Sequence, residues 1–346
     1  MDDTLRVLNL DEAKTFAMWR AFLERFAITN FTSAELTRID RSLGIFDVTG
    51  RLVATGSAAG DVLKYVAVDN ESSEQGSRFN ALMTALMDDR ARKGIFHLFV
   101  SCGPHACPSF EHIGFHVLVR SDLGALLETG DRGIDDYVAN LPRIPDQNEM
   151  RVAAIVMNAN PFTCGHRALV ERAVSESDLV YVFVVSDDVS LVPTADRIAL
   201  VRQGVRDLPR VRVVAGGEYM VSRVTFPAYF LPSDAQALTY QTTLDALLFK
   251  CRIAPPLNIT ARYLGTEPFS PTTARYNEAL KRELPPEVEV RIMERARSGA
   301  QVISATAVRA AIEAGAPERI ADLVPDATFA YIKEHIRDLQ ARSQRR

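Results

Sequence analysis

The stretch from Met157 to His166 combines residue types that can bind a phosphate chain. We expect it at the point where a buried strand turns into a helix. Ligands of open α/β sheets bind beyond the carboxyl ends of the strands, where a helix N-terminus offers N–H groups and a positive partial charge to phosphate. Gly165 lets the backbone approach a ligand closely because glycine lacks a Cβ. Asn160, Thr163 and His166 add side chains that can contact phosphate oxygens.

A second stretch of similar character, Ile303–Arg309, lies far along the chain. Ser304 or Thr306 can cap the helix that it opens. Arg309 lies about one turn past that start, so its guanidinium fork can reach a phosphate held there. Two helix starts, one with an imidazole and one with hydroxyls and a guanidinium, together predict a clamp for a triphosphate.

Three further polar residues form a second tier of candidates. Arg197 follows an aspartate at an expected helix start, Glu267 lies just beyond an expected strand end, and Arg275 opens another expected helix. These positions are near the crevice at the carboxyl edge of such a sheet. Surface ion pairs occupy similar positions, so spacing alone gives these residues no role.

The cysteines and histidines do not predict a metal site. Cys102, Cys107, His112 and His116 are close in sequence, but their spacing departs from the short Cys-x₂-Cys hook of zinc sites. We expect His112 on a short helix and His116 on the following strand, both with structural roles. Cys164 lies inside the candidate phosphate loop, and we do not expect it to be a nucleophile.

The elements that must position the candidate residues alternate between strand and helix over residues 151–346. Apolar stretches without polar alternation are typical of strands buried on both faces. Five strands are expected, at Val152–Met157, Leu179–Val185, Val211–Val214, Ala261–Leu264 and Val288–Ile292. Strands separated by helices, joined by right-handed crossovers, predict a Rossmann-like doubly wound parallel sheet.

Residues 1–141 read as a separate α+β domain, and the proline-containing polar stretch 142–150 reads as a linker. The order of a strand, a glycine loop, a helix and a strand suits an acyl-CoA acetyltransferase core. Gly76 keeps the middle glycine of that core's pyrophosphate loop, whereas Ser73 and Arg78 depart from its outer positions. Amide groups at the helix start could still bind a pyrophosphate.

Composition excludes several classes of function. Of 346 residues, 40 are Lys or Arg and 44 are Asp or Glu, which gives a formal net charge of −4 and none of the basic excess of a nucleic-acid binder. The apolar runs are too short to cross a bilayer, and the N-terminus has no basic and apolar signal pattern. Four scattered cysteines argue against a disulfide scaffold. We therefore expect a cytoplasmic protein with no nucleic-acid or membrane partner.

The two candidate stretches carry a family resemblance. Thr163–His166 resembles the threonine form of the His-x-Gly-His signature of the nucleotidylyltransferase superfamily. Ile303–Arg309 resembles its Ile-Ser-Ser-Thr-x-x-Arg signature, with Ala305 in place of the second serine. Four stretches resemble the citrate lyase ligase family more closely, which also has an acetyltransferase-like N-terminal domain: residues 158–163, 190–202, 217–231 and 264–277. This resemblance covers nearly the whole chain.

The resemblance implies an α/β fold with a C-terminal nucleotidylyltransferase-type sheet and an N-terminal acetyltransferase-like domain. It also implies a ligase that uses ATP, with Mg²⁺ on the phosphates, and acetate. Through acetyl-AMP, such an enzyme acetylates the prosthetic-group thiol on the acyl carrier subunit of citrate lyase. AMP and pyrophosphate are released, and the lyase becomes active.

On that mechanism, His166 and the N–H groups after Gly165 stabilise charge at the α-phosphate. Ser304, Thr306 and Arg309 hold the β- and γ-phosphates. Mg²⁺ bridging phosphate oxygens keeps most of its waters, so the chain need not show a dedicated site for it. The N-terminal domain would receive the prosthetic group, which resembles a dephospho-CoA arm.

Two other functions stay open at this point. An adenylyltransferase acting on a small phosphorylated acceptor, such as a pantetheine phosphate, would use the same clamp but leave a stable nucleotide product. A catalytically silent nucleotide- or CoA-binding regulator would bind ATP without consuming it. Dependence of pyrophosphate release on acetate separates these functions, and pocket shape decides between acetate and slightly larger acids.

Overall fold

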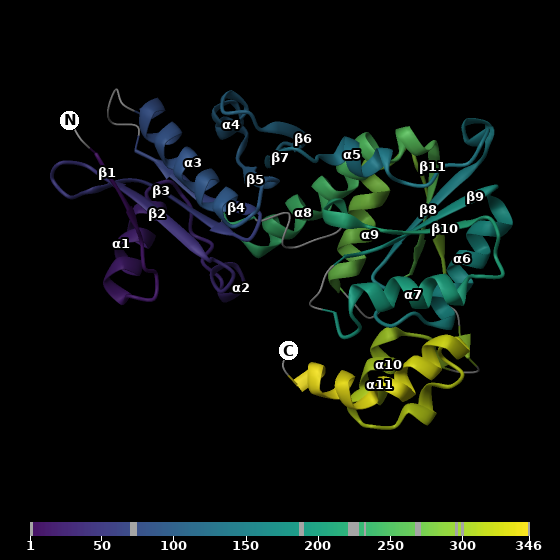
Figure 1. The fold of residues 1–346 in the computed structure, drawn as a ribbon. Coiled ribbons are helices and arrows are strands. Elements are labelled where there is room, and N and C mark those ends of the chain that lie inside the picture. Colours follow the sequence, from purple (N-terminus) through teal and green to yellow (C-terminus); the bar gives the residue numbers. More distant parts are fainter. Residues whose placement is uncertain are drawn as a thin grey trace. The chain divides into compact units, whose positions relative to one another are not determined.

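The computed structural model describes residues 3–69, 75–186, 190–220, 228–231, 233–266, 271–294, 297–298 and 301–344 (Figure 1). The chain forms two compact units. Unit 1 consists of Met1–Asp136 and Arg223–Leu244, and unit 2 consists of Tyr137–Ser222 and Asp245–Arg346. Two of the three points of division fall within helices, α5 (Ile134–Ala139) and α8 (Asp234–Leu248).

Unit 1 is built on a seven-stranded sheet with the strand order β1-β2-β3-β4-β5-β7-β6. The strands are β1 (Thr4–Val7), β2 (Arg41–Phe46), β3 (Leu52–Ala59), β4 (Val62–Val68), β5 (Leu98–Cys102), β6 (His116–Ser121) and β7 (Gly124–Thr129). Its other helices are α1 (Ala13–Glu24), α2 (Ser33–Leu36), α3 (Gln75–Arg92) and α4 (Cys107–His112). Among the described strands of this sheet, only β4 and β5 pair in parallel, and α3 packs across β2, β3 and β4, which confirms the expected α+β order.

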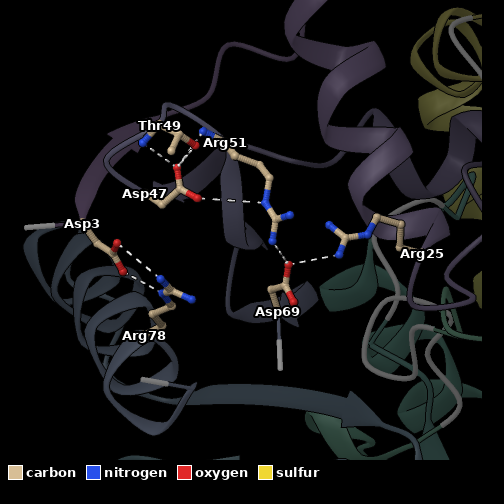
Figure 2. Close-up of polar contacts among 7 residues, drawn as sticks. All are labelled: Asp3, Arg25, Asp47, Thr49, Arg51, Asp69 and Arg78. Atoms are coloured by element: carbon tan, nitrogen blue, oxygen red, sulfur yellow. Dashed lines mark hydrogen bonds and ion pairs between the residues drawn. The ribbon is translucent and has the colours of Figure 1, made fainter. Parts of the chain in front are cut away.

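The turn between β2 and β3 is closed by hydrogen bonds to one carboxylate. Asp47 accepts hydrogen bonds from the backbone N–H groups of Thr49 and Arg51 and from the Thr49 hydroxyl, and Gly50 adopts a φ of 80° (Figure 2). The Thr49 hydroxyl bond is the main cause of the lowered pKa of Asp47. Arg51 and Arg25 both donate to Asp69, the residue after β4, so this end of the sheet is held by ion pairs.

Unit 1 includes a segment that sequence analysis placed in the C-terminal domain. The Tyr229 hydroxyl donates to Ser101 O at 3.2 Å, and the Tyr240 hydroxyl donates to Ala125 O at 3.0 Å. Both tyrosines are buried, and burial raises the pKa of each hydroxyl. Residues 228–244 therefore complete the core of unit 1, a long-range association that local periodicity does not reveal.

The stretch expected as a linker, 142–150, is bound to unit 2. Tyr181 donates its hydroxyl hydrogen bond to this stretch, and the Gln147 amide donates to Leu257 O at 2.6 Å. Asn258 donates to three of its carbonyls, at Gln147, Asn148 and Met150. The division of the chain accordingly falls before this stretch, at Asp136, rather than within it.

Unit 2 has the five-stranded parallel sheet that the sequence predicts, in the order β10-β9-β8-β11-β12. The strands are β8 (Val152–Met157), β9 (Leu179–Val184), β10 (Val211–Ala215), β11 (Ile259–Gly265) and β12 (Glu289–Met293). A short unpredicted ribbon pairs β13 (Arg297–Ser298) with β14 (Gln301–Val302). The strand order reverses at β8, so the carboxyl edge beside β8 and β11 is a topological switch point, where such sheets bind ligands.

Helices cover both faces of this sheet, which confirms the Rossmann-like class. The helices of unit 2 are α6 (Cys164–Glu176), α7 (Thr194–Gly204), α9 (Pro271–Glu283), α10 (Ala305–Glu313) and α11 (Asp326–Gln344). Apolar side chains of α6, α7, α10 and α11 form one core with alternate residues of β8 and β9, and Figure 1 shows α10 and α11 beside α7. On the opposite face, Phe249 packs edge-on against Phe183 of β9.

Candidate functional site

The loop after β8 ends in a reciprocal cap that fixes His166. Thr163 is the N-cap of α6, and its hydroxyl accepts the His166 backbone N–H at 3.3 Å. In return, the Thr163 backbone N–H donates to His166 Nδ1 at 3.1 Å. Such paired bonds satisfy two of the donors that a helix start leaves open. The predicted helix start and its imidazole are therefore present as one rigid unit.

The cap also sets the tautomer of the imidazole. A backbone N–H can only donate, so Nδ1 of His166 is an acceptor and the proton of the neutral ring lies on Nε2. The ring stacks on the buried Phe162, with centroids 5.8 Å apart and planes 16° from parallel. His166 is half-buried, so its Nε2–H is held as an oriented donor beside the N-terminus of α6.

The second helix start lies against the first. Ser304 is the N-cap of α10 and accepts from the Ala307 N–H at 3.1 Å. A Cβ added to Gly165 would lie 3.5 Å from the carbonyl oxygen of Ile303, so the residue before the Ser304 cap lies close beside the start of α6. That spacing is ordinary, so the fold itself does not require a glycine at position 165.

Arg309 joins the two candidate stretches directly. Its Nη1 donates to Asn160 O at 2.8 Å, and its Nη2 donates to Thr306 Oγ1 at 2.9 Å. Both acceptors are neutral, and Arg309 is half-buried. The structure thus brings together all the residues that the sequence proposed for the clamp, although their contact with a nucleotide stays a prediction.

Asn160, predicted to contact phosphate, also makes a hydrogen bond within the protein. Its side chain is buried, and Oδ1 accepts the backbone N–H of Val192 at 3.0 Å. Ala159, beside it, has a φ of 48°, a left-handed conformation that costs free energy for a residue with a Cβ. Nδ2 of Asn160 is therefore the atom of this amide that can donate to a phosphate.

Arg197, a second-tier candidate, lies fully inside unit 2. Its guanidinium donates to the carbonyl oxygens of Asn158, Val185 and Val192, to Asn158 Oδ1 and to Thr194 Oγ1. It therefore ties the loop after β8 to the end of β9 and to the start of α7. Sequence analysis did not single out Asn158, although its position directly after a buried strand was a usable signal.

The other weaker candidates are not brought to this loop by any contact among the described residues. Glu267 lies outside those residues, and Arg275 is an exposed residue of α9. Gly76 is exposed at the second position of α3, in unit 1, and an added Cβ there would meet nothing within 4 Å. Nearby, Arg78 donates from Nε to Asp3 at 2.6 Å (Figure 2).

Cysteine chemistry does not distinguish the site. Burial is the main cause of the raised pKa of the Cys164 thiol at the start of α6, which disfavours the thiolate. Sγ atoms of Cys102 and Cys107 lie 3.4 Å apart, and His112 and His116 end α4 and begin β6. In the described part of the chain, no three His, Cys, Asp or Glu side chains form a group that could hold a metal ion.

Comparison with known proteins decides the family. A sequence profile described as "Citrate lyase ligase C-terminal domain" matches residues 152–332. [Citrate [pro-3S]-lyase] ligase of Klebsiella pneumoniae is 35% identical over 290 residues, which cover 82% of this chain and 84% of that protein. The protein of the same name from Escherichia coli K12 is 33% identical over 331 residues, 92% of this chain and 94% of that one. The chain belongs to the citrate lyase ligase family.

Members of this family are ligases, so the chain is an enzyme. Solved structures similar to part of it include the ribosomal-protein-S18-alanine N-acetyltransferase of Escherichia coli, with 17% identity, 38% of this chain and 97% of that chain covered, and a TM-score of 0.31. A GNAT-family acetyltransferase of Staphylococcus aureus MU50 gives 9% identity, 37% and 99% coverage, and a TM-score of 0.30. Within the residues described, no helix has the length and apolar character needed to span a membrane.

Proposed function

We propose that this enzyme activates citrate lyase by acetylating the prosthetic-group thiol of the lyase's acyl carrier subunit, with acetate and the magnesium complex of ATP as co-substrates. AMP and pyrophosphate are the other products, and the reaction takes place in the cytoplasm. Membership of the family over most of the chain supports the overall activity. The observation that supports this chemistry is the hydrogen bond from Arg309 to Asn160 O. It joins helix α10 to the loop that leads into α6, so the starts of the two helices lie close together.

In the first step, an acetate oxygen attacks the α-phosphorus of ATP, and the bond to the pyrophosphate oxygen breaks. Little covalent chemistry falls to the protein in such a transfer, so catalysis consists of positioning and of stabilising charge. His166 Nε2 and the N–H groups at the start of α6 are donors for the α-phosphate oxygens. The Thr163 cap holds that imidazole in place, so little reorganisation is needed during the reaction.

Ser304, Thr306 and Arg309 are proposed to hold the departing pyrophosphate. Their helix, α10, begins with open N–H groups and a positive partial charge, both of which favour an anion. Arg309 adds a formal charge, oriented by Thr306 Oγ1. The carrier thiol then attacks the carbonyl carbon of acetyl-AMP, the carbon–oxygen bond to AMP breaks, and the thioester forms.

Unit 1 is proposed to receive the CoA-like arm of the carrier, with the start of α3 at Gly76 as the place for its phosphate groups. Removing residues 1–140 is a poor test of this role, because residues 228–244 pack against them. A substitution at Gly76 leaves that packing intact, since nothing lies within 4 Å of an added Cβ.

Pyrophosphate release with and without acetate and thiol-form carrier tests the proposed function. We expect release to require acetate, and sustained turnover to require the carrier as well. Acetyl-AMP formed without the carrier should be trapped by hydroxylamine as acetohydroxamate. Acetate-independent release, with a stable nucleotide product from a pantetheine phosphate, would instead indicate an adenylyltransferase.

A further inference from the structure

Asn158 is an exposed residue whose side chain is nevertheless fixed. It is the first residue after β8, at the switch-point edge of the sheet. Its Oδ1 accepts from Arg197 Nη1 at 2.8 Å and from the Ser190 hydroxyl at 3.0 Å. A guanidinium only donates, so the atom that faces Arg197 must be the amide oxygen. The amide nitrogen, Nδ2, consequently points to the other side.

The support for this amide is rigid. Arg197 is fully buried, and it also binds the backbone oxygen of Asn158 at 2.8 Å, Val185 O at 2.6 Å and Val192 O at 3.0 Å. These bonds anchor it to the end of β9 and to the approach to α7. Holding an exposed side chain in one rotamer costs conformational entropy without burying apolar surface. A side chain held in this way is typical of a binding site that is preorganised for its ligand.

All contacts that the described chain makes with this amide fall on its oxygen. Nδ2 is therefore an oriented, neutral donor of two hydrogen bonds on the exposed side of this loop. Its loop continues to Asn160, whose carbonyl binds Arg309, and to the start of α6. Asn158 thus lies in the same loop as Asn160 and Thr163, but at the end of the loop next to β8 rather than the end next to α6.

We infer that Nδ2 of Asn158 binds the carboxylate of the acid substrate and orients it toward the α-phosphorus. The inference rests on the proposed function. Attack and departure are roughly in line in phosphoryl-type transfers, so the acid must approach opposite the pyrophosphate. In the proposed function, the start of α10 holds the departing pyrophosphate and the start of α6 holds the α-phosphate, which leaves the strand end of the loop for the acid. A neutral amide suits this task because it positions the carboxylate without neutralising the charge that makes it a nucleophile.

The test uses two substitutions in the full-length protein, Asn158→Ala and Asn158→Asp. Alanine removes the donor together with the acceptor. Aspartate keeps an oxygen for Arg197 and Ser190 and replaces only the outward NH₂ with a second oxygen, which repels a carboxylate. Asn148→Asp, at an exposed asparagine in the 142–150 stretch, adds the same charge elsewhere and is the matched control.

Acetate-dependent exchange between ATP and pyrophosphate is the measurement, because it needs no carrier. Asn158→Ala should raise the KM for acetate about 10- to 100-fold, the usual effect of losing a hydrogen bond to a charged group. Asn158→Asp should raise it further, while the KM for ATP stays within about twofold in both variants. The control should match the wild type. Thermal unfolding of each variant shows whether it is folded. If alanine disturbs the loop by removing the acceptor for Arg197 and Ser190, the aspartate variant still tests the inference, because it keeps that acceptor.

Two outcomes overturn the inference in distinguishable ways. If wild-type exchange depends on acetate and the variants change only the KM for ATP, or change nothing, Asn158 does not bind the acid and the proposed function stands. If the folded wild type shows no acid-dependent exchange at all, the proposed function fails and this inference fails with it.

Discussion

The start of α3 in unit 1 and the start of α6 in unit 2 are both candidates for phosphate binding, yet the arginines beside them are held differently. At α3, Arg78 donates to the carboxylate of Asp3, which orients the guanidinium and cancels its charge (Figure 2). Beside α6, Arg309 donates to Asn160 O and Thr306 Oγ1, which connect it to the loop after β8 and to its own helix. The comparison teaches that an arginine near a helix start can serve the local framework, as Arg78 does with Asp3, or connect two candidate phosphate-binding stretches, as Arg309 does with Asn160.

The largest expected effect is at the α6 start. His166→Ala should lower the rate of acetate-dependent pyrophosphate release by about 100- to 1,000-fold, the usual loss when one preorganised donor to a transition-state charge is removed. His112→Ala, at an exposed histidine of α4, is the control and should keep full activity. Near-normal turnover by a folded His166→Ala protein would remove the imidazole from the mechanism.

Arg309 should give the next largest effect. Arg309→Ala should lower kcat/KM for ATP by about 10- to 100-fold, since it removes a charged donor to the pyrophosphate side. Arg309→Lys should restore part of the loss, because lysine keeps the charge but not the fork. Arg319→Ala, at an exposed arginine of the same region, should change little. An unchanged kcat/KM for ATP in Arg309→Ala would make this arginine a framework residue like Arg78.

A smaller effect is expected at the α3 start. Gly76→Asp adds a negative charge at the exposed start of the helix, which should repel the phosphates of the carrier's arm. Transfer of the acetyl group to the carrier should slow about two- to fivefold, the range of helix-terminus electrostatics, while ATP–pyrophosphate exchange stays unchanged. Gly103→Asp is the control, since its added Cβ also meets nothing within 4 Å. Equal rates of acetyl transfer in Gly76→Asp and Gly103→Asp would show that the start of α3 does not bind the carrier's arm.

The smallest expected effect concerns an ion pair of the framework on α6 itself. Hydrogen bonding from Arg167 is the main cause that lowers the pKa of Asp207 from 3.8 to about 2. A carboxylate with a depressed pKa in the folded state stabilises the fold above about pH 4, and this contribution is lost as the pH falls toward 2. Asp207→Asn should therefore unfold less steeply with acid over that interval and keep its exchange activity at neutral pH. The thermal unfolding midpoints of the wild type and of Asp207→Asn, measured across this pH interval, test the expected stability difference. A lower exchange activity of Asp207→Asn at neutral pH would show that the ion pair also positions residues of the site.

Local features of the site could be predicted from the sequence, because they depend on neighbours in the chain. Thr163 and Ser304 cap the two helices as their types predict, and the parallel sheet follows from its apolar strands. The burial of Arg197 could not be predicted, since a charged residue at a helix start is usually exposed. Its partners come from two separate loops, and only the folded chain brings them together.

Long-range associations account for the remaining differences. Residues 228–244 join unit 1 through Tyr229 and Tyr240, although 128 residues separate Tyr229 from Ser101 and 115 residues separate Tyr240 from Ala125. The contact between Arg309 and Asn160 likewise spans two stretches that no local pattern connects. The residue types at the two helix starts predicted one shared clamp, and the family motifs agreed with it, whereas periodicity alone connects neither stretch to the other.

A crystal structure with bound ATP tests the central claim most directly. The account predicts His166 Nε2 at hydrogen-bonding distance from the α-phosphate and the Arg309 guanidinium on the β- or γ-phosphate of the same nucleotide. A structure in which only one of these groups contacts the triphosphate, or in which they face different ligands, would contradict it.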